Sequence, residues 1–121
     1  MKAVIDSDVL IDYLQGVDAA KAELDRYRRP LYSVISFMEL LCGAQSDVER
    51  KAAENLLSMM ERVDISEAIA RRAVEVRKKH RLKLPDAIVL ASAEAEDCLL
   101  VTRNTKDFPR GHPQIRFPYS V

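Results

Sequence analysis

The chain has 121 residues, nearly half of them apolar and nearly a third charged, and its formal net charge is +0. This length suits one compact domain with one core and is too short for a catalytic domain with a separate substrate domain. The composition is typical of a globular protein and excludes a disordered or low-complexity chain. No apolar run approaches the ~20 residues of a membrane span, and the start MKAVID does not resemble a signal peptide. We therefore expect a cytoplasmic protein with no membrane partner.

The charges are unevenly distributed along the chain. Residues 1–70 contain 8 Lys and Arg against 13 Asp and Glu, whereas residues 71–121 contain 11 against 6. This asymmetry predicts an acidic site and a basic surface on one molecule.

Short β-forming segments alternate with helical segments along the first half. The predicted elements are a strand at 1–5, helices at 9–14 and 17–28, a strand at 31–35, and helices at 36–44 and 47–60. Pro30 ends the second helix, and Ser36 is the expected N-cap of the third. Ser46 and Glu49 have the spacing of a capping box for the fourth.

The second half continues the alternation. The predicted elements are a strand at 62–65, a helix that runs from 65 into the basic segment RKKHRLK, a buried helix from Pro85 to 96, a strand at 98–102 and a last strand at 115–117. Strands that alternate with helices predict an α/β domain with a short, mainly parallel sheet of four to five strands. In such a sheet, ligands bind beyond the carboxyl ends of the strands.

Four acidic residues are placed so that they can meet at that edge. Asp6 follows the first strand, Glu39 lies in the helix after the second, Asp86 opens a later helix, and Asp107 follows the fourth strand. Because they arrive from separate segments, local structure alone does not require them together.

Each of the four also has a purely structural interpretation. Asp6 can cap the first helix, Glu39 can complete a capping box with Ser36, and the helix dipole favours Asp86 in a first turn. Asp107 can be an ordinary loop residue.

A cluster of carboxylates is stable in the ionised form only when a cation binds it, because like charges raise each other's pKa. Oxygen ligands without His or Cys select hard cations, here Mg²⁺ or Mn²⁺. Such a site suits hydrolysis of a phosphodiester by metal-activated water, with no protein nucleophile.

Two further groups of side chains fit this chemistry. Ser7, Thr102 and Asn104 can orient the carboxylates by hydrogen bonds, although they are also common cap and turn residues. Basic residues near the predicted site can bind phosphate groups; these are Arg103, Lys106, Arg110 and the segment 77–83.

The blocks VIDSDVLIDYL, VISFMELLCGA, LPDAIVLASA and LLVTRNTKDF, in this order and spacing, resemble the PIN domain. They are most similar to the short VapC-type toxins of toxin–antitoxin pairs, and the resemblance covers the chain from Ala3 to Phe108. It implies a single PIN-like domain over 1–121 with three α/β/α layers. It also implies an endoribonuclease whose Mg²⁺ or Mn²⁺ is held by Asp6, Glu39, Asp86 and Asp107.

The resemblance further implies an RNA substrate, a homodimer and a cognate antitoxin protein. Asn104 matches a position that is aspartate in many members, so its contact with metal stays open. Asp8 is expected to be auxiliary and Asp12 to lie on the surface. Apolar residues of the first helix are the expected interface; these are Val9, Leu10, Tyr13 and Leu14. The identity of the RNA and the number of metal ions also stay open.

Two other functions remain as alternatives. VIDSDVLID also resembles the first motif of haloacid-dehalogenase-like phosphatases, in which the first Asp is a nucleophile. Against this, the chain is short for that family and has no recognisable later lysine motif. The second alternative is a PIN-like scaffold that binds RNA or protein without cleavage.

Overall fold

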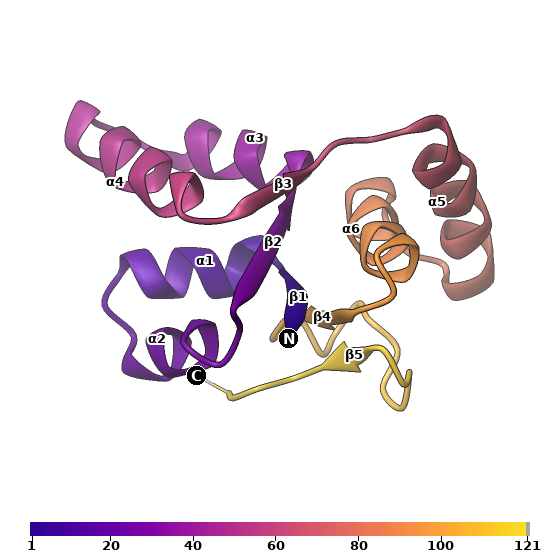
Figure 1. Cartoon of the computed structure of the whole chain (residues 1–121). Coiled ribbons are helices and arrows are strands. Elements are labelled where there is room, and N and C mark those ends of the chain that lie inside the picture. The colour runs from indigo at the N-terminus through magenta and orange to yellow at the C-terminus, as the bar shows by residue number, and fades with distance from the viewer. Residues whose placement is uncertain (121) are drawn as a thin grey trace.

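The computed structural model describes residues 1–120, and these form one five-stranded sheet with six helices (Figure 1). The elements are β1 (Lys2–Ile5), α1 (Ser7–Leu14), α2 (Asp18–Leu24), β2 (Arg29–Ser33), α3 (Val34–Gly43), α4 (Asp47–Ser58), β3 (Glu61–Val63), α5 (Glu67–His80), α6 (Leu84–Ala95), β4 (Leu99–Val101) and β5 (Ile115–Arg116). The strand order is β3-β2-β1-β4-β5, and every neighbouring pair is parallel. The predicted α/β fold with a mainly parallel sheet is confirmed.

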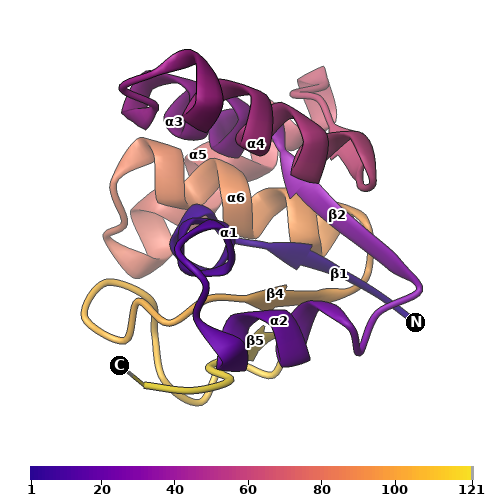
Figure 2. The ribbon, with the colours of Figure 1, turned by 90° about the vertical axis from the view of Figure 1, so that its left-hand side faces the viewer.

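Helices cover both faces of the sheet. Successive side chains of a strand point to opposite faces, so each face has its own apolar core. Val4 and Leu100 belong to the core with α5 and α6, whereas Ile5 and Val101 belong to the core with α1 to α4. Figures 1 and 2 show α5 and α6 on one side of the sheet and α1 to α4 on the other. This confirms the predicted three layers.

Helix α6 is buried, as its nearly continuous apolar pattern predicts. It has Pro85 in its first turn, and its fully buried apolar residues are Ala87, Val89, Leu90, Ala91 and Ala93. One assignment for the preceding helix is wrong: Ile65 lies before α5 and is 41% exposed, because Ser66 is the N-cap. Within residues 1–120, no helix is long and apolar enough to cross a membrane.

The boundary between β2 and α3 lies two residues earlier than predicted, because β2 ends at Ser33 and α3 begins at Val34. Ser33, not Ser36, is the N-cap of α3, and its Oγ accepts a hydrogen bond from the Ile35 amide at 3.1 Å. Ser36 is fully buried inside the helix. The capping-box interpretation of Glu39 is therefore wrong, and its position needs another explanation.

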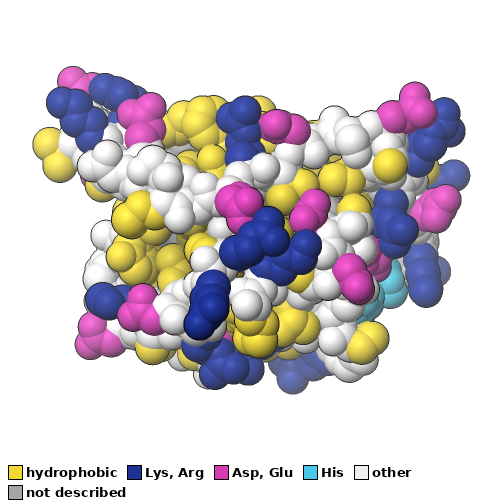
Figure 3. Space-filling view, in the orientation of Figure 1, with side chains coloured by type: hydrophobic (Ala, Val, Ile, Leu, Met, Phe, Trp, Pro, Cys, Tyr) yellow, Lys and Arg dark blue, Asp and Glu magenta, His cyan; other side chains and the backbone are white. Residues whose placement is uncertain are grey.

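The apolar residues of α1 divide between the core and the surface. Val9 and Leu10 are 0% exposed, so the hypothesis that they form an interface is wrong. Leu14 is exposed and Tyr13 is half-buried. Figure 3 shows apolar side chains on the surface between α4 and the α1–α2 pair, where Tyr13 and Met60 line a pocket. These side chains are available for contact with a partner.

Candidate active site

A cleft of about 480 Å³ lies at the carboxyl end of β1. It is lined by Asp6, Ser7, Asp8, Ile11, Glu39, Asp86, Arg103, Asn104, Thr105 and Lys106. The lining comes from α1, α3, α6 and the loop after β4, which is the convergence that the sequence predicts. A parallel sheet produces this convergence because all strand ends of one kind meet at one edge.

Asp6 occupies the junction of β1 and α1 and is only 7% exposed. Its Oδ1 accepts a hydrogen bond from the Ser7 amide at 2.8 Å, which makes it the N-cap of α1, and its Oδ2 accepts one from Thr102 Oγ1 at 2.8 Å. Burial, and then the negative charge of Asp8, raises the pKa of Asp6 to about 7. The structural and functional interpretations of Asp6 are therefore compatible.

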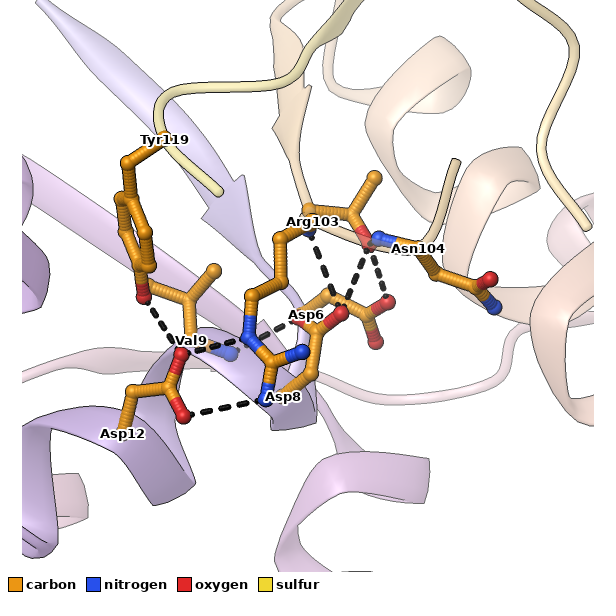
Figure 4. A network of polar contacts seen from close by, with 8 residues as sticks. Asp6, Asp8, Val9, Asp12, Arg103, Asn104 and Tyr119 are labelled. Atoms are coloured by element: carbon orange, nitrogen blue, oxygen red, sulfur yellow. Dashed lines mark hydrogen bonds and ion pairs between the residues drawn. The ribbon is translucent and has the colours of Figure 1, made fainter. Parts of the chain in front are cut away.

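Asp8 also belongs to this site (Figure 4). Its Oδ1 accepts a hydrogen bond from the Val9 amide at 2.7 Å, and its Oδ2 accepts one from the Arg103 amide at 3.2 Å. Thr102 Oγ1 lies 3.2 Å from the same Oδ2. Burial raises the pKa of Asp8 despite these hydrogen bonds. Thr102 therefore links the two aspartates.

Glu39 is held in the cleft by a serine of another helix. Ser7 Oγ donates a hydrogen bond to Glu39 Oε1 at 2.6 Å, and the Ser7 and Ser36 hydroxyl oxygens are 2.8 Å apart. The buried Ser36 thus supports the pair from inside α3. Contact with Ser7, rather than helix capping, explains the position of Glu39.

Asp86 opens α6 and is half-buried beside other carboxylates. Burial, and then the charges of Asp107 and Glu39, raises the pKa of Asp86. Asp107 lies outside the lining of the cleft, and Asn104 orients it: Asn104 Nδ2 donates to Asp107 Oδ2 at 3.0 Å, and the Asp107 amide donates to Asn104 Oδ1 at 3.1 Å.

The basic residues of the loop after β4 differ from one another. Lys106 is exposed and lines the cleft, and Arg110 is exposed but is not part of the lining. The Arg103 guanidinium forms a bidentate ion pair with Asp12, at 2.6 Å from Nε to Oδ2 and 3.1 Å from the second nitrogen to Oδ1. Lys106 is therefore the loop cation best placed to meet a phosphate.

Asp12 and Tyr119 also belong to this region, although the sequence predicts a surface position for Asp12 and does not single out Tyr119. Asp12 is 4% exposed, so its assignment to the surface is wrong. Tyr119 donates its hydroxyl hydrogen to Asp12 Oδ2 at 2.8 Å (Figure 4). The hydrogen bond with Arg103 lowers the pKa of Asp12, whereas burial raises the pKa of Tyr119. The i, i+4 spacing from Asp8 gave no sign of these distant partners.

The chemistry of these donors fits a hard cation. The cleft offers carboxylate oxygens without His or Cys, which are the ligands of a hard cation. Burial raises the pKa values of Asp6, Asp8 and Asp86, and neighbouring carboxylates add to the rise at Asp6 and Asp86. Among residues 1–120, no three acidic, His or Cys side chains are yet arranged to hold one ion. Holding an ion therefore requires side-chain movements toward a shared centre.

The fold and this acidic cleft define an α/β protein of the PIN class. The PIN domain family model matches residues 3–111, and the chain belongs to that family. The chain is 36% identical, over 98% of its length and 93% of the relative's, to Ribonuclease VapC10 of Mycobacterium tuberculosis. It is 38% identical to a chain of a solved toxin–antitoxin complex from Klebsiella pneumoniae, with a TM-score of 0.92 and coverage of 98% of this chain and 99% of that one.

A more distant structure shares the fold. The DNA-bound VapBC structure from Salmonella typhimurium is 21% identical, with a TM-score of 0.78 and 96% coverage of both chains. The alternative of a haloacid-dehalogenase-like phosphatase depended on the first motif alone. Because the PIN family model matches residues 3–111, which include that motif, the motif no longer supports a phosphatase.

Proposed function

We propose that the chain is a metal-dependent endoribonuclease and the toxin of a toxin–antitoxin pair, acting on RNA in the cytoplasm as a single PIN-like domain. The proposal rests on one observation: Asp6, Glu39 and Asp86, from three separate segments, line one cleft in a chain of the PIN family. The name of the Mycobacterium tuberculosis relative, Ribonuclease VapC10, supports the activity.

The acidic residues would hold Mg²⁺ or Mn²⁺. Asp6, Glu39 and Asp86 face the cleft, and Asp107 adds its charge beside Asp86. When bound, the cation lowers the pKa of a water molecule and stabilises negative charge on the phosphate.

The neighbouring polar residues fix the orientation of these carboxylates. Ser7 holds Glu39, Thr102 holds Asp6, and Asn104 holds Asp107. Lys106, on the rim of the cleft, would bind a phosphate of the RNA.

The proposed partners are a cognate antitoxin and a second copy of the chain. The toxin–antitoxin complex from Klebsiella pneumoniae supports the antitoxin. Ile11, Leu14 and Met38 are exposed apolar residues of α1 and α3, and they offer surface for either contact. Light scattering across a range of concentrations tests the homodimer, and a constant monomer mass would remove it.

The test of the activity is RNA cleavage by purified protein with Mg²⁺, Mn²⁺ or EDTA. Asp86→Asn should lower the rate about 100-fold or more, because metal ions supply several kcal/mol of transition-state stabilisation. Asp18→Asn is a matched control, since Asp18 also lies in the first turn of a helix but outside the cleft. The control should retain the full rate.

Two other results would contradict the proposal. Metal binding without cleavage of structured or unstructured RNA would favour a PIN-like scaffold. Equal cleavage by Asp86→Asn and wild type would show that the carboxylates do not act on these RNAs.

A further inference from the structure

The two ends of Arg103 bind two different aspartates of α1. Its guanidinium pairs with Asp12, and its backbone amide donates to Asp8 Oδ2 (Figure 4). Asp8 and Asp12 are one helical turn apart, so Arg103 connects the loop after β4 to α1 at two points. A guanidinium in a bidentate pair has fewer free donors for a phosphate.

The residues on either side of Arg103 hold other acidic groups. Thr102 donates to Asp6, the Asn104 amide donates to Thr102 Oγ1 at 3.1 Å, and the Asn104 side chain holds Asp107. A shift of the backbone at Arg103 would therefore disturb the supports of Asp6, Asp8 and Asp107 together.

The third partner of this network comes from the C-terminal segment. Tyr119 donates to the same Asp12 Oδ2 that accepts from Arg103 Nε. The segment is fixed to α2 by a bidentate ion pair between Arg116 and Glu23, at 2.7 and 3.0 Å. Glu23 is 4% exposed, so this second attachment is also buried on one side. Tyr119 thus reaches Asp12 from a backbone that is anchored to α2 by this ion pair and to β4 by the pairing of β5.

We propose that Asp12, Arg103 and Tyr119 form a brace that positions the acidic residues for a divalent cation, and that Arg103 is a positioning residue, not an RNA ligand. This inference rests on the proposed metal site and goes beyond it. The C-terminal segment contributes to this brace through the Tyr119 hydroxyl group, and its Arg116 carbonyl also accepts a hydrogen bond from the Thr102 amide at 3.1 Å.

The first test is the Mn²⁺ dissociation constant, measured by electron paramagnetic resonance of free Mn²⁺. Asp12→Asn and Arg103→Gln should each raise it about 10- to 100-fold, the range found when partners that orient metal ligands are removed. Tyr119→Phe should raise it less, because Arg103 still holds Asp12. The double variant Asp12→Asn/Arg103→Gln should be no worse than either single variant, since both remove the same contact.

The second test needs no metal. Hydrogen exchange in EDTA should show faster exchange of amides 102–107 in Asp12→Asn and Tyr119→Phe than in wild type, with core strand amides unchanged. Arg29→Gln is the control, because it breaks a bidentate pair with Glu61, at 2.8 and 3.1 Å, at the amino ends of β2 and β3, opposite to the edge with the cleft. It should leave both the exchange of 102–107 and the Mn²⁺ affinity unchanged.

The affinity for a non-cleavable 2′-O-methyl RNA shows whether Arg103 positions the acidic residues or binds RNA. If Arg103→Gln lowers this affinity while Asp12→Asn leaves Mn²⁺ binding and exchange unchanged, Arg103 binds RNA and the brace is wrong. A wild-type protein that binds no Mn²⁺ also overturns it. A protein that binds Mn²⁺ with the expected variant pattern but cleaves no RNA keeps the brace and removes only the nuclease.

Discussion

The Asp6 carboxyl group makes two structural hydrogen bonds and is also one of the proposed ligands of the metal ion. It caps α1 through the Ser7 amide, and it accepts a hydrogen bond from Thr102. Both contacts favour the ionised form, yet burial and the charge of Asp8 outweigh them and raise its pKa to about 7. A cation in the cleft would reverse that balance, because it favours the ionised carboxylate.

The raised pKa of Asp6 predicts how stability changes with pH in EDTA. The folded state holds the proton up to about pH 7, whereas an unfolded Asp loses it near 3.8, so stability falls as pH rises between these values. At pH 8, Asp6→Asn should be more stable than wild type by about 1–3 kcal/mol, because Asn also caps helices well and carries no charge. Urea denaturation at pH 8 and pH 4 measures the difference. It should vanish near pH 4, and an equal difference at both values would contradict the assignment.

At the scale of elements, the beginning of α3 shows how long-range packing overrides local propensity. The β-branched residues Val34 and Ile35 favour a strand, yet they form the first turn of α3. β2 ends at Ser33 because its pairing with β3 ends there, at Ser33 and Val63. Because α3 begins at Val34, Glu39 lies within hydrogen-bond distance of the Ser7 hydroxyl group.

The assignment of Ser33 as the N-cap of α3 can be tested by mutation. Ser33→Ala should lower the free energy of unfolding by about 1–2 kcal/mol, because it removes the acceptor for the Ile35 amide from a fully buried cap. Ser58→Ala, an exposed serine near the end of α4, should change it by less than about 0.5 kcal/mol. Urea denaturation of both variants is the measurement. Equal values for the two would argue against Ser33 as the cap.

The sequence predicts the order of the elements, the cleft and the hydrogen bonds of Ser7, Thr102 and Asn104, but not the contacts among Asp12, Arg103 and Tyr119. The strands and helices follow from local periodicity, and a parallel sheet then brings Asp6, Glu39 and Asp86 to one edge. The pairing of Asp12 with Arg103 spans 91 residues, and no local pattern indicates which arginine a given aspartate meets. The sequence therefore places Asp12 wrongly on the surface and does not predict the ion pair of Arg103.

At the scale of the whole molecule, the net charge of +0 is the sum of an acidic region and a basic region. The cleft is acidic, whereas the last turn of α5 contains Arg77, Lys78, Lys79 and His80. Figure 3 shows Lys and Arg side chains grouped around α5. With no net charge, the molecule exerts little long-range attraction on RNA, so local charge at the cleft decides whether a phosphate can enter.

This arrangement predicts that Mg²⁺ strengthens RNA binding, opposite to its usual screening effect on protein–RNA contacts. In EDTA the carboxylates repel a phosphate in the cleft by about 1 kcal/mol for each pair of charges about 4 Å apart in water. If bound Mg²⁺ removes one or two such repulsions, the affinity for 2′-O-methyl RNA should rise about 5- to 30-fold relative to EDTA. Fluorescence anisotropy at constant ionic strength measures this change.

Two variants show whether this gain comes from the cleft. Asp86→Asn, which removes one repelling charge and one metal ligand, should bind RNA more tightly than wild type in EDTA and gain less from Mg²⁺. Asp18→Asn should behave as wild type, because Asp18 lies outside the cleft. If Mg²⁺ instead weakens binding in wild type as much as in Asp86→Asn, RNA binds away from the acidic residues, and the cleft is not where the backbone enters.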